Sequence, residues 1–257
     1  MTAHAVYPSL YAKRVFITGG ASGIGAALVD AFAAQGAAVA FVDINTQAGR
    51  ALARDLQASG GPQPISFTPC DVADVAALQS TLQKQAEAMG GLDVLINNVA
   101  SDQRHQTETL SPASWRANLA INLDPTFFAT QAALPFLQAA VAAAVINISS
   151  LNAFLGPADM PAYAAAKSAI LGLTKAQARE FGQAKIRVNA IVPGWVDTPA
   201  QRERGWLTPQ TQAAWIDQCA LKTLIEPSDV ARLAMFLASN EARMITGQSF
   251  VIDAGRT

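Results

Sequence analysis

Seven short runs rich in β-branched or aromatic residues recur along this chain, and a segment of helix-forming residues separates each run from the next. Strands that alternate with helices form a parallel sheet, because each helix returns the chain to the edge where the next strand starts. The apolar residues of VFI at residues 15–17 and VINI at residues 145–148 do not alternate with polar ones, as in strands buried on both faces. The pattern predicts a single α/β domain with helices on both faces of the sheet and strands at residues 14–18, 38–43, 64–69, 93–97, 144–149, 187–192 and 249–253.

Composition limits the partners of this domain. Of 257 residues, 51% are hydrophobic and only 14% are charged, so the chain has ample material for a core. The net charge is −1 and no basic cluster is present, which argues against nucleic acid. No signal-like segment and no membrane-length apolar run occurs, so we expect a soluble, cytoplasmic protein. Cys70 and Cys219 lack the spacing of metal ligands, so we expect no metal site and no disulfide framework.

A glycine-rich segment, TGGASGIG at residues 18–25, follows the first expected strand and opens the first expected helix. Gly19, Gly23 and Gly25 would let a pyrophosphate approach the backbone, and the helix N-terminus offers it unpaired N–H groups. Asp43 ends the second strand, 18 positions after Gly25, where its carboxylate can accept hydrogen bonds from ribose hydroxyls. This combination predicts dinucleotide binding.

The residues around Asp43 favour NAD over NADP. The carboxylate would repel a 2′-phosphate, and neither Ser22 in the glycine-rich turn nor Ile44 after the aspartate supplies a cation for it. Further short polar segments, CDV at residues 70–72 and NNVA at residues 97–100, follow the third and fourth strands. They lie at the edge where open α/β sheets bind ligands.

Tyr163 and Lys167 occupy positions i and i+4 of the segment YAAAK, so on a helix they share one face. Pro161 marks the start of that helix, and Ser149 and Ser150 end the fifth strand. Tyrosine titrates near pH 10, so a tyrosine base needs a nearby cation. Lys167 and an oxidised nicotinamide can both provide one. A tyrosine and a lysine at this spacing are common by chance, and it is the neighbouring proline and serines that favour a catalytic pair.

These motifs, with Asn122 and the segment PGWVDT at residues 193–198, resemble the short-chain dehydrogenase/reductase family across almost the whole chain. The resemblance implies a Rossmann fold with strand order 3-2-1-4-5-6-7 and a homotetramer. It also implies that residues 1–100 form mainly the dinucleotide-binding half and residues 101–257 the catalytic half. Ala100 replaces the glycine that is commoner in the NNAG motif of the family.

The resemblance implies a role for each catalytic residue. Tyr163 would be the general base in oxidation, and Ser150, 13 positions before it, would hydrogen-bond the reacting oxygen. Lys167 would lower the tyrosine pKa and hold the nicotinamide ribose, and Asn122 would hold a water in a proton relay. The expected cofactor-binding residues are Gly19, Ser22, Gly23, Ile24, Gly25, Asp43, Ile44, Asp71, Val72, Asn98, Tyr163, Lys167, Pro193, Val196 and Thr198.

Residues 194–222, the substrate segment, interrupt the alternation of strands and helices, and we expect an irregular binding loop there. Polar and aromatic residues in this segment and in the loops after the fourth and fifth strands suit a hydroxyl-rich substrate, because each hydroxyl needs a polar partner. The alternative for each arginine is a solvated surface or an oligomer contact. The expected substrate residues are Gln103, Arg104, His105, Ser150, Asn152, Trp195, Arg202 and Trp206.

A narrower resemblance supports a carbohydrate substrate. The segments YPSL at residues 7–10 and DQRH at residues 102–105, together with the region after residue 201, are similar to bacterial D-xylose 1-dehydrogenases and related aldose dehydrogenases. Those enzymes oxidise the anomeric hydroxyl of an aldose to a lactone. Two alternatives stay open: a dehydrogenase acting on a secondary alcohol of a sugar acid or 2-keto-3-deoxy sugar acid, and a dinucleotide sensor without catalysis.

Overall fold

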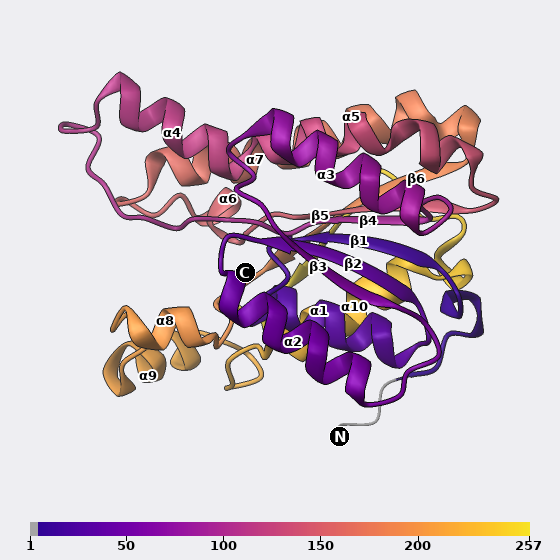
Figure 1. Cartoon of the computed structure of the whole chain (residues 1–257). Helices are drawn as coiled ribbons and strands as arrows, with labels where there is room; N and C mark the ends of the chain where they lie inside the picture. The colour runs from indigo at the N-terminus through magenta and orange to yellow at the C-terminus, as the bar shows by residue number, and fades with distance from the viewer. Residues whose placement is uncertain (1–4) are drawn as a thin grey trace.

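Seven parallel strands form one sheet in the computed structural model, which describes residues 5–257 (Figure 1). Their order is β3-β2-β1-β4-β5-β6-β7, as the resemblance implied. Each neighbouring pair is parallel. The strands are β1 Arg14–Thr18, β2 Ala38–Asp43, β3 Ile65–Pro69, β4 Val94–Asn97, β5 Ala143–Ile148, β6 Ile186–Pro193 and β7 Ser249–Ile252. The expected strand limits differ from these by at most one residue at either end.

Two layers of helices enclose the sheet, and one hydrophobic core lies under each layer (Figure 1). One layer contains α1 (Gly23–Ala34), α2 (Thr46–Ala58) and α10 (Pro227–Ala238). The other contains α3 (Val75–Ala88), α4 (Pro112–Asn122), α5 (Asp124–Ala139) and α7 (Pro161–Phe181). Strands β1, β4 and β5 are buried on both faces, which explains their uninterrupted apolar sequences. Short 3₁₀ helices occur at Pro8–Leu10, Gly182–Ala184 and Asn240–Ala242.

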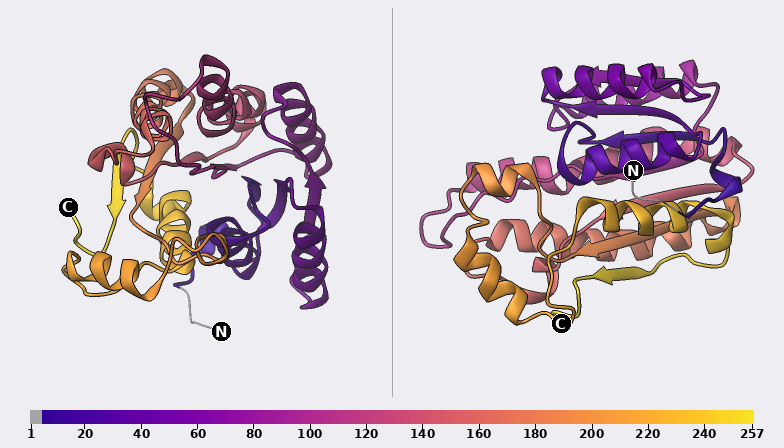
Figure 2. Two further views of the ribbon diagram at one scale, coloured as in Figure 1. Left: turned by 90° about the vertical axis from the view of Figure 1, so that its left-hand side faces the viewer. Right: turned by 90° about the horizontal axis from the view of Figure 1, so that it is seen from below.

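The substrate segment is more regular than expected. It contains two short helices, α8 (Pro199–Glu203) and α9 (Pro209–Asp217), which stand apart from the two helix layers at one end of the molecule (Figure 2). Pro199 and Pro209 are the first residues of these helices, where no backbone N–H is needed. Thr198 and Thr208 precede them and accept hydrogen bonds from the first turns. The expectation of an irregular loop was therefore wrong.

The strand order places a crevice between β1 and β4. Chain connections leave these neighbouring strands in opposite directions, so the loops beyond their carboxyl ends separate. The short helix α6 (Asn152–Leu155) and the substrate segment approach the same edge of the sheet.

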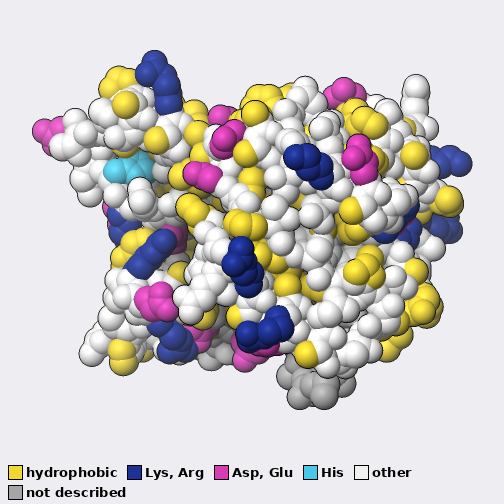
Figure 3. Space-filling view, in the orientation of Figure 1, with side chains coloured by type: hydrophobic (Ala, Val, Ile, Leu, Met, Phe, Trp, Pro, Cys, Tyr) yellow, Lys and Arg dark blue, Asp and Glu magenta, His cyan; other side chains and the backbone are white. Residues whose placement is uncertain are grey.

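On the face shown in Figure 3, basic side chains are scattered among acidic ones without a continuous patch of either. None of the helices within residues 5–257 has both the length and the apolar character to cross a bilayer.

Candidate active site

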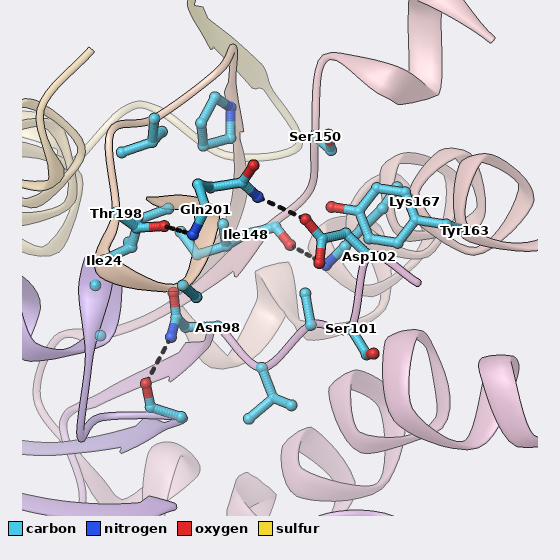
Figure 4. Close-up of a pocket in the computed structure, with 18 of the residues that line it drawn as sticks. Ile24, Asn98, Ser101, Asp102, Ile148, Ser150, Tyr163, Lys167, Thr198 and Gln201 are labelled. Atoms are coloured by element: carbon cyan, nitrogen blue, oxygen red, sulfur yellow. Dashed lines mark hydrogen bonds between the residues drawn. The ribbon is translucent and has the colours of Figure 1, made fainter. Parts of the chain in front are cut away.

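A cavity of about 760 Å³ lies at the carboxyl edge of the sheet (Figure 4). Segments that follow β1 to β6 line it, together with residues of α1 and α7. In Figure 4, Ile24 and Asn98 lie on one side of the view, and Ser150 and Tyr163 lie on the other. All fifteen residues that the sequence predicts to bind the cofactor line this cavity. The fold thus brings residues from both halves of the chain to one place.

The glycine-rich turn between β1 and α1 leaves no space for side chains. A Cβ on Gly25 would lie 1.7 Å from the carbonyl oxygen of Gly19. Gly19 and Gly23 have φ angles of +67° and +52°, in the left-handed region that favours glycine. Asn98 donates hydrogen bonds to the carbonyl oxygens of Thr18 and Gly19, at 3.1 and 3.0 Å, so the end of β4 supports the turn. Ser22 does not cap α1 with its side chain, which leaves the first-turn N–H groups without this partner.

The carboxylate of Asp43 lies at the end of β2 beside this turn. One oxygen accepts the Ala21 N–H at 3.0 Å and the other accepts the Asn45 N–H at 2.8 Å. These bonds fix the carboxylate at the cavity wall and leave lone pairs for further donors. The side chain of Ile44 is 74% exposed at the same wall. Arg104, Lys167 and Arg204 are the basic residues among those that line the cavity, and none belongs to the β2 loop.

Tyr163 and Lys167 lie on one face of α7, as their spacing predicts, and both are buried. Burial raises the pKa of Tyr163 to about 12, the Ser150 hydroxyl opposes this change, and the negative charge of Asp102 adds to it. Burial lowers the pKa of Lys167 to about 7. The Lys167 Nζ donates to the Ile148 carbonyl at 2.9 Å and lies 5.8 Å from the centroid of the Tyr163 ring. Burial therefore dominates the pKa of Tyr163, although the sequence predicted that Lys167 would lower it.

The two serines that follow β5 have different environments. Ser149 is buried, and its hydroxyl donates to the Lys167 carbonyl at 2.7 Å. Ser150 is half-buried, and its hydroxyl oxygen accepts the Asn152 N–H at 3.2 Å. The hydroxyl of Ser150 also acts on the pKa of Tyr163. The geometry favours Ser150 as the serine nearer to a reacting group.

Polar bonds attach α7 to the end of β5. The Asn147 side chain donates to the Thr174 hydroxyl at 3.0 Å. The next two residues, Ile148 and Ser149, bond to the side chain and the carbonyl of Lys167. Three consecutive residues therefore hold α7 in its position along the strand.

Asn122 does not line the cavity, although the sequence predicted a catalytic role for it. It is buried at the end of α4, where its side chain bonds to two other residues. The side-chain oxygen accepts the Ser101 N–H at 2.8 Å, and the amide nitrogen donates to the Ser101 carbonyl at 3.0 Å. The same nitrogen donates to Asn118 at 3.1 Å. The side chain therefore fixes the loop after β4.

Five of the eight predicted substrate residues line the cavity, and three do not. Arg104, Ser150, Asn152, Trp195 and Trp206 line the cavity. The remaining three, Gln103, His105 and Arg202, lie outside this lining. Arg202, in the last turn of α8, is exposed and pairs with Asp197 inside its own segment. His105 instead bonds to the backbone at the start of α7.

Asp102 is a cavity residue that sequence reasoning missed. One carboxylate oxygen accepts the Gln201 side-chain N–H at 2.6 Å, and the other accepts a bond from Arg204. Trp195 donates its indole N–H to Gln201 at 2.9 Å. Figure 4 shows Asp102 between Gln201 and Tyr163. Its position as the first charged residue after β4 was the available signal.

Trp206 connects the substrate segment to the loop after β4. The guanidinium groups of Arg104 and Arg204 lie 4.9 and 5.0 Å from the centroid of its ring. Arg104 is also paired with Asp159, and Arg204 with Asp102. Both arginines at the cavity thus already have a carboxylate partner.

We expect the stability of the Lys167→Met variant, compared with cofactor-free wild type at the same pH, to be more favourable at pH 7 than at pH 10. The folded-state pKa of about 7 lies below the unfolded value near 10.4, so between these pH values the unfolded chain binds more protons. Wild-type stability should therefore rise with pH in this window, whereas methionine does not titrate. Thermal unfolding at a series of pH values measures the difference.

The pH dependence is the informative readout here, because the substitution also removes the hydrogen bond to the Ile148 carbonyl, which affects stability at every pH. Lys175→Met is the matched control, since Lys175 is exposed on the same helix. A stability difference between wild type and Lys167→Met that stays constant from pH 7 to 10 would contradict the lowered pKa.

Comparisons with known proteins agree with this geometry. A family model described as "Enoyl-(Acyl carrier protein) reductase" matches residues 19–257. A D-xylose 1-dehydrogenase of Caulobacter vibrioides is 42% identical over 251 residues, which cover 98% of each chain. A probable galactose dehydrogenase of Rhizobium meliloti is 40% identical, over 97% of this chain and 96% of that protein.

A solved structure of a short-chain dehydrogenase from Burkholderia cenocepacia in complex with NADP has a TM-score of 0.89 and 31% identity. The match covers 96% of this chain and 99% of that chain. Together with the parallel sheet, the glycine-rich turn and the cavity beside Tyr163 and Lys167, these similarities assign the chain to the short-chain dehydrogenase/reductase family.

Proposed function

We propose that this protein oxidises the anomeric hydroxyl of an aldose, a pentose or a 6-deoxyhexose, to the lactone, with hydride transfer to NAD. The observation that carries the proposal is the cavity wall beside Tyr163, where a carboxylate, paired arginines and indole rings lie together. Relatives named for xylose and galactose, which are both aldoses, add support.

The protein fits a dinucleotide at the other part of the cavity. A side chain on Gly25 would collide with the backbone of the turn, so the glycines preserve a smooth cradle for a pyrophosphate. The N-terminus of α1 offers N–H groups to phosphate oxygens, and Asp43 offers acceptors to ribose hydroxyls. Lys167 would hold the nicotinamide ribose. The oxidised cofactor, when bound, supplies a hydride acceptor and a positive charge.

Side chains of this protein would accept the proton that the substrate hydroxyl loses. Tyr163 would remove the proton from the C1 hydroxyl, and Ser150 would donate a hydrogen bond to the same oxygen. A positive charge near Tyr163 is needed, because its surroundings, burial above all, hold its pKa at about 12. Asn122 would act through Ser101, whose backbone it binds on both sides. The proton relay would then pass through the amino group of Lys167 without a water held by Asn122.

The charges in the cavity favour a neutral sugar over a sugar acid. A substrate carboxylate needs a free guanidinium, but Arg104 and Arg204 are already paired with Asp159 and Asp102. A carboxylate beside Tyr163 repels a substrate anion and accepts hydrogen bonds from hydroxyls. We therefore propose that Asp102 accepts a bond from a sugar hydroxyl while an indole ring contacts the C–H face. A dinucleotide sensor has no need of this arrangement.

Reduction of NAD by the purified protein tests this function. The substrates are D-xylose, L-arabinose, L-fucose, D-glucose, their aldonic acids and simple secondary alcohols. We expect turnover of at least one aldose and formation of its lactone, detected by mass spectrometry or by trapping with hydroxylamine. Turnover of the acids alone would refute the aldose proposal, and turnover of nothing would favour a sensor. The family resemblance further supports a cytoplasmic location and a homotetramer. Light scattering during size-exclusion chromatography would test the homotetramer.

Asp43→Ala should raise the KM for NAD about tenfold, because hydrogen bonds to a charged group are lost. The same change should improve the use of NADP relative to NAD, since the repulsion of a 2′-phosphate disappears. Steady-state kinetics with both cofactors provides the measurement. Asp30→Ala is the control, because Asp30 is exposed on α1 and does not line the cavity. Equal use of both cofactors by the wild-type protein would overturn the proposed preference.

A further inference from the structure

The start of helix α7 lacks a cap from its own sequence. Met160 precedes the helix, its side chain does not cap the helix by a hydrogen bond, and Pro161 has no N–H group. The Ala164 N–H bonds to the Met160 carbonyl at 2.9 Å, which leaves the N–H groups of Ala162 and Tyr163 as the first donors without an intrahelical partner. Ala162 is fully buried, and a buried N–H without a partner is costly.

His105 supplies the missing partner from another part of the chain. Its Nε2 accepts the Ala162 N–H at 3.1 Å, and its Nδ1 lies 3.1 Å from the carbonyl oxygen of Gln103. A carbonyl can only accept, so Nδ1 carries the hydrogen, and Nε2 must be free of one to accept from Ala162. These two contacts therefore require the neutral ring with its hydrogen on Nδ1.

The backbone strengthens this attachment. The His105 N–H donates to the Asp159 carbonyl at 2.8 Å, and the neighbouring Arg104 pairs with the Asp159 side chain. The loop after β4 is thus bound both to the turn before α7 and to the first free N–H of α7, which belongs to Ala162. Tyr163 follows Ala162 directly, so a movement of Ala162 moves the tyrosine.

We infer that His105 is a positioning residue for Tyr163: its neutral imidazole caps α7 at Ala162 and thereby sets the place of the tyrosine hydroxyl relative to Ser150. This role differs from the substrate contact that the sequence suggested, because His105 does not line the cavity. It rests on the proposed function in one respect, that Tyr163 is the base. A displacement of a catalytic group by about 1 Å can cost about 100-fold in rate, so a cap of this kind matters for turnover.

Paired substitutions separate a cap from a bulky filler. His105→Phe keeps a flat ring but has no acceptor, and we expect kcat to fall about 10- to 100-fold with little change in KM. His105→Gln places an amide oxygen near the position of Nε2, and we expect kcat to return to within about threefold of wild type, since the Ala162 bond is restored. Both variants should bind NADH as wild type does. Circular dichroism and thermal unfolding establish that each is folded.

The opposite kinetic result would overturn the inference. Equal kcat values for the two variants, or a wild-type kcat for His105→Phe, would show that the acceptor is unimportant. A raised KM with an unchanged kcat would mark His105 as a substrate contact. These assays use whichever alcohol the wild-type protein oxidises, so failure of the aldose proposal leaves them decisive.

Nuclear magnetic resonance tests the cap without any turnover. The chain has two histidines, His4 and His105, so a His4→Gln background leaves a single imidazole. Long-range proton–nitrogen spectra at pH 8 should show the hydrogen of His105 on Nδ1. A hydrogen on Nε2 would refute the inference whatever the enzyme oxidises, and would do so even if the sugar panel showed no activity.

Discussion

Tyr163→Phe should lower kcat for oxidation by about 1,000-fold or more, because the change removes the only atom of this side chain that can take a proton. The substitution preserves the buried ring and its packing against Lys167, so the fold and the cofactor affinity should be retained. Initial rates with saturating substrate measure the loss, and quenching or enhancement of NADH fluorescence measures cofactor binding.

Tyr11→Phe is the matched control for this experiment. Tyr11 is 61% exposed and does not line the cavity, so its hydroxyl should be dispensable. The pH profile adds a second readout: the phenolate is the active form in oxidation, so kcat/KM of the wild type should rise with pH below the pKa of the tyrosine. A Tyr163→Phe enzyme that kept a tenth or more of the wild-type kcat would remove Tyr163 from the mechanism.

Gly25→Ala should weaken NAD binding by about 100-fold or more, since about 3 kcal/mol of strain corresponds to that factor. The new Cβ would lie 1.7 Å from the Gly19 oxygen and 2.7 Å from its carbon, so the turn has to open. Both atoms belong to the backbone, which cannot rotate away as a flexible side chain does. Isothermal titration with NAD and NADH measures the effect, and thermal unfolding measures the accompanying loss of stability.

Gly172→Ala is the control for the chemical change itself. Gly172 is exposed on α7, and a Cβ there would contact nothing within 4 Å. Alanine is the better helix former, so this variant should be as stable as wild type or more stable by up to about 1 kcal/mol. If Gly25→Ala bound NAD within threefold of wild type while folded, the glycine-rich turn would not be the pyrophosphate site.

The sequence predicted the strands well and selected residues that line one cavity, for local physical reasons. Uninterrupted apolar runs identify strands that are buried on both faces, and the glycine-rich turn directly after β1 marks the edge of the sheet where the cavity lies, which is the proposed phosphate site. The i, i+4 spacing of Tyr163 and Lys167 is enough to place both on one face of α7. These features depend on residues that are close together in the chain.

The substrate side was harder to predict because its contacts join distant residues. Asp102 bonds to Gln201 and Arg204, and His105 bonds to Ala162, so the partners lie 57 to 102 positions apart. Nothing local in the sequence distinguishes an arginine that faces a ligand from one that is paired with an aspartate. For the same reason, sequence reasoning placed His105 against the substrate rather than at the end of a helix.

The bonds from Asn147, Ile148 and Ser149 to α7 have a consequence for how this enzyme can diversify. One residue of an α-helix spans about 1.5 Å along its axis, so a slip of α7 by a single residue would break all three bonds at once. The position of α7 along β5 is thus set by the interior of the protein. The substrate segment, which follows β6, takes no part in these three bonds and can change without breaking them. New substrate preferences can therefore arise around an unchanged reaction centre.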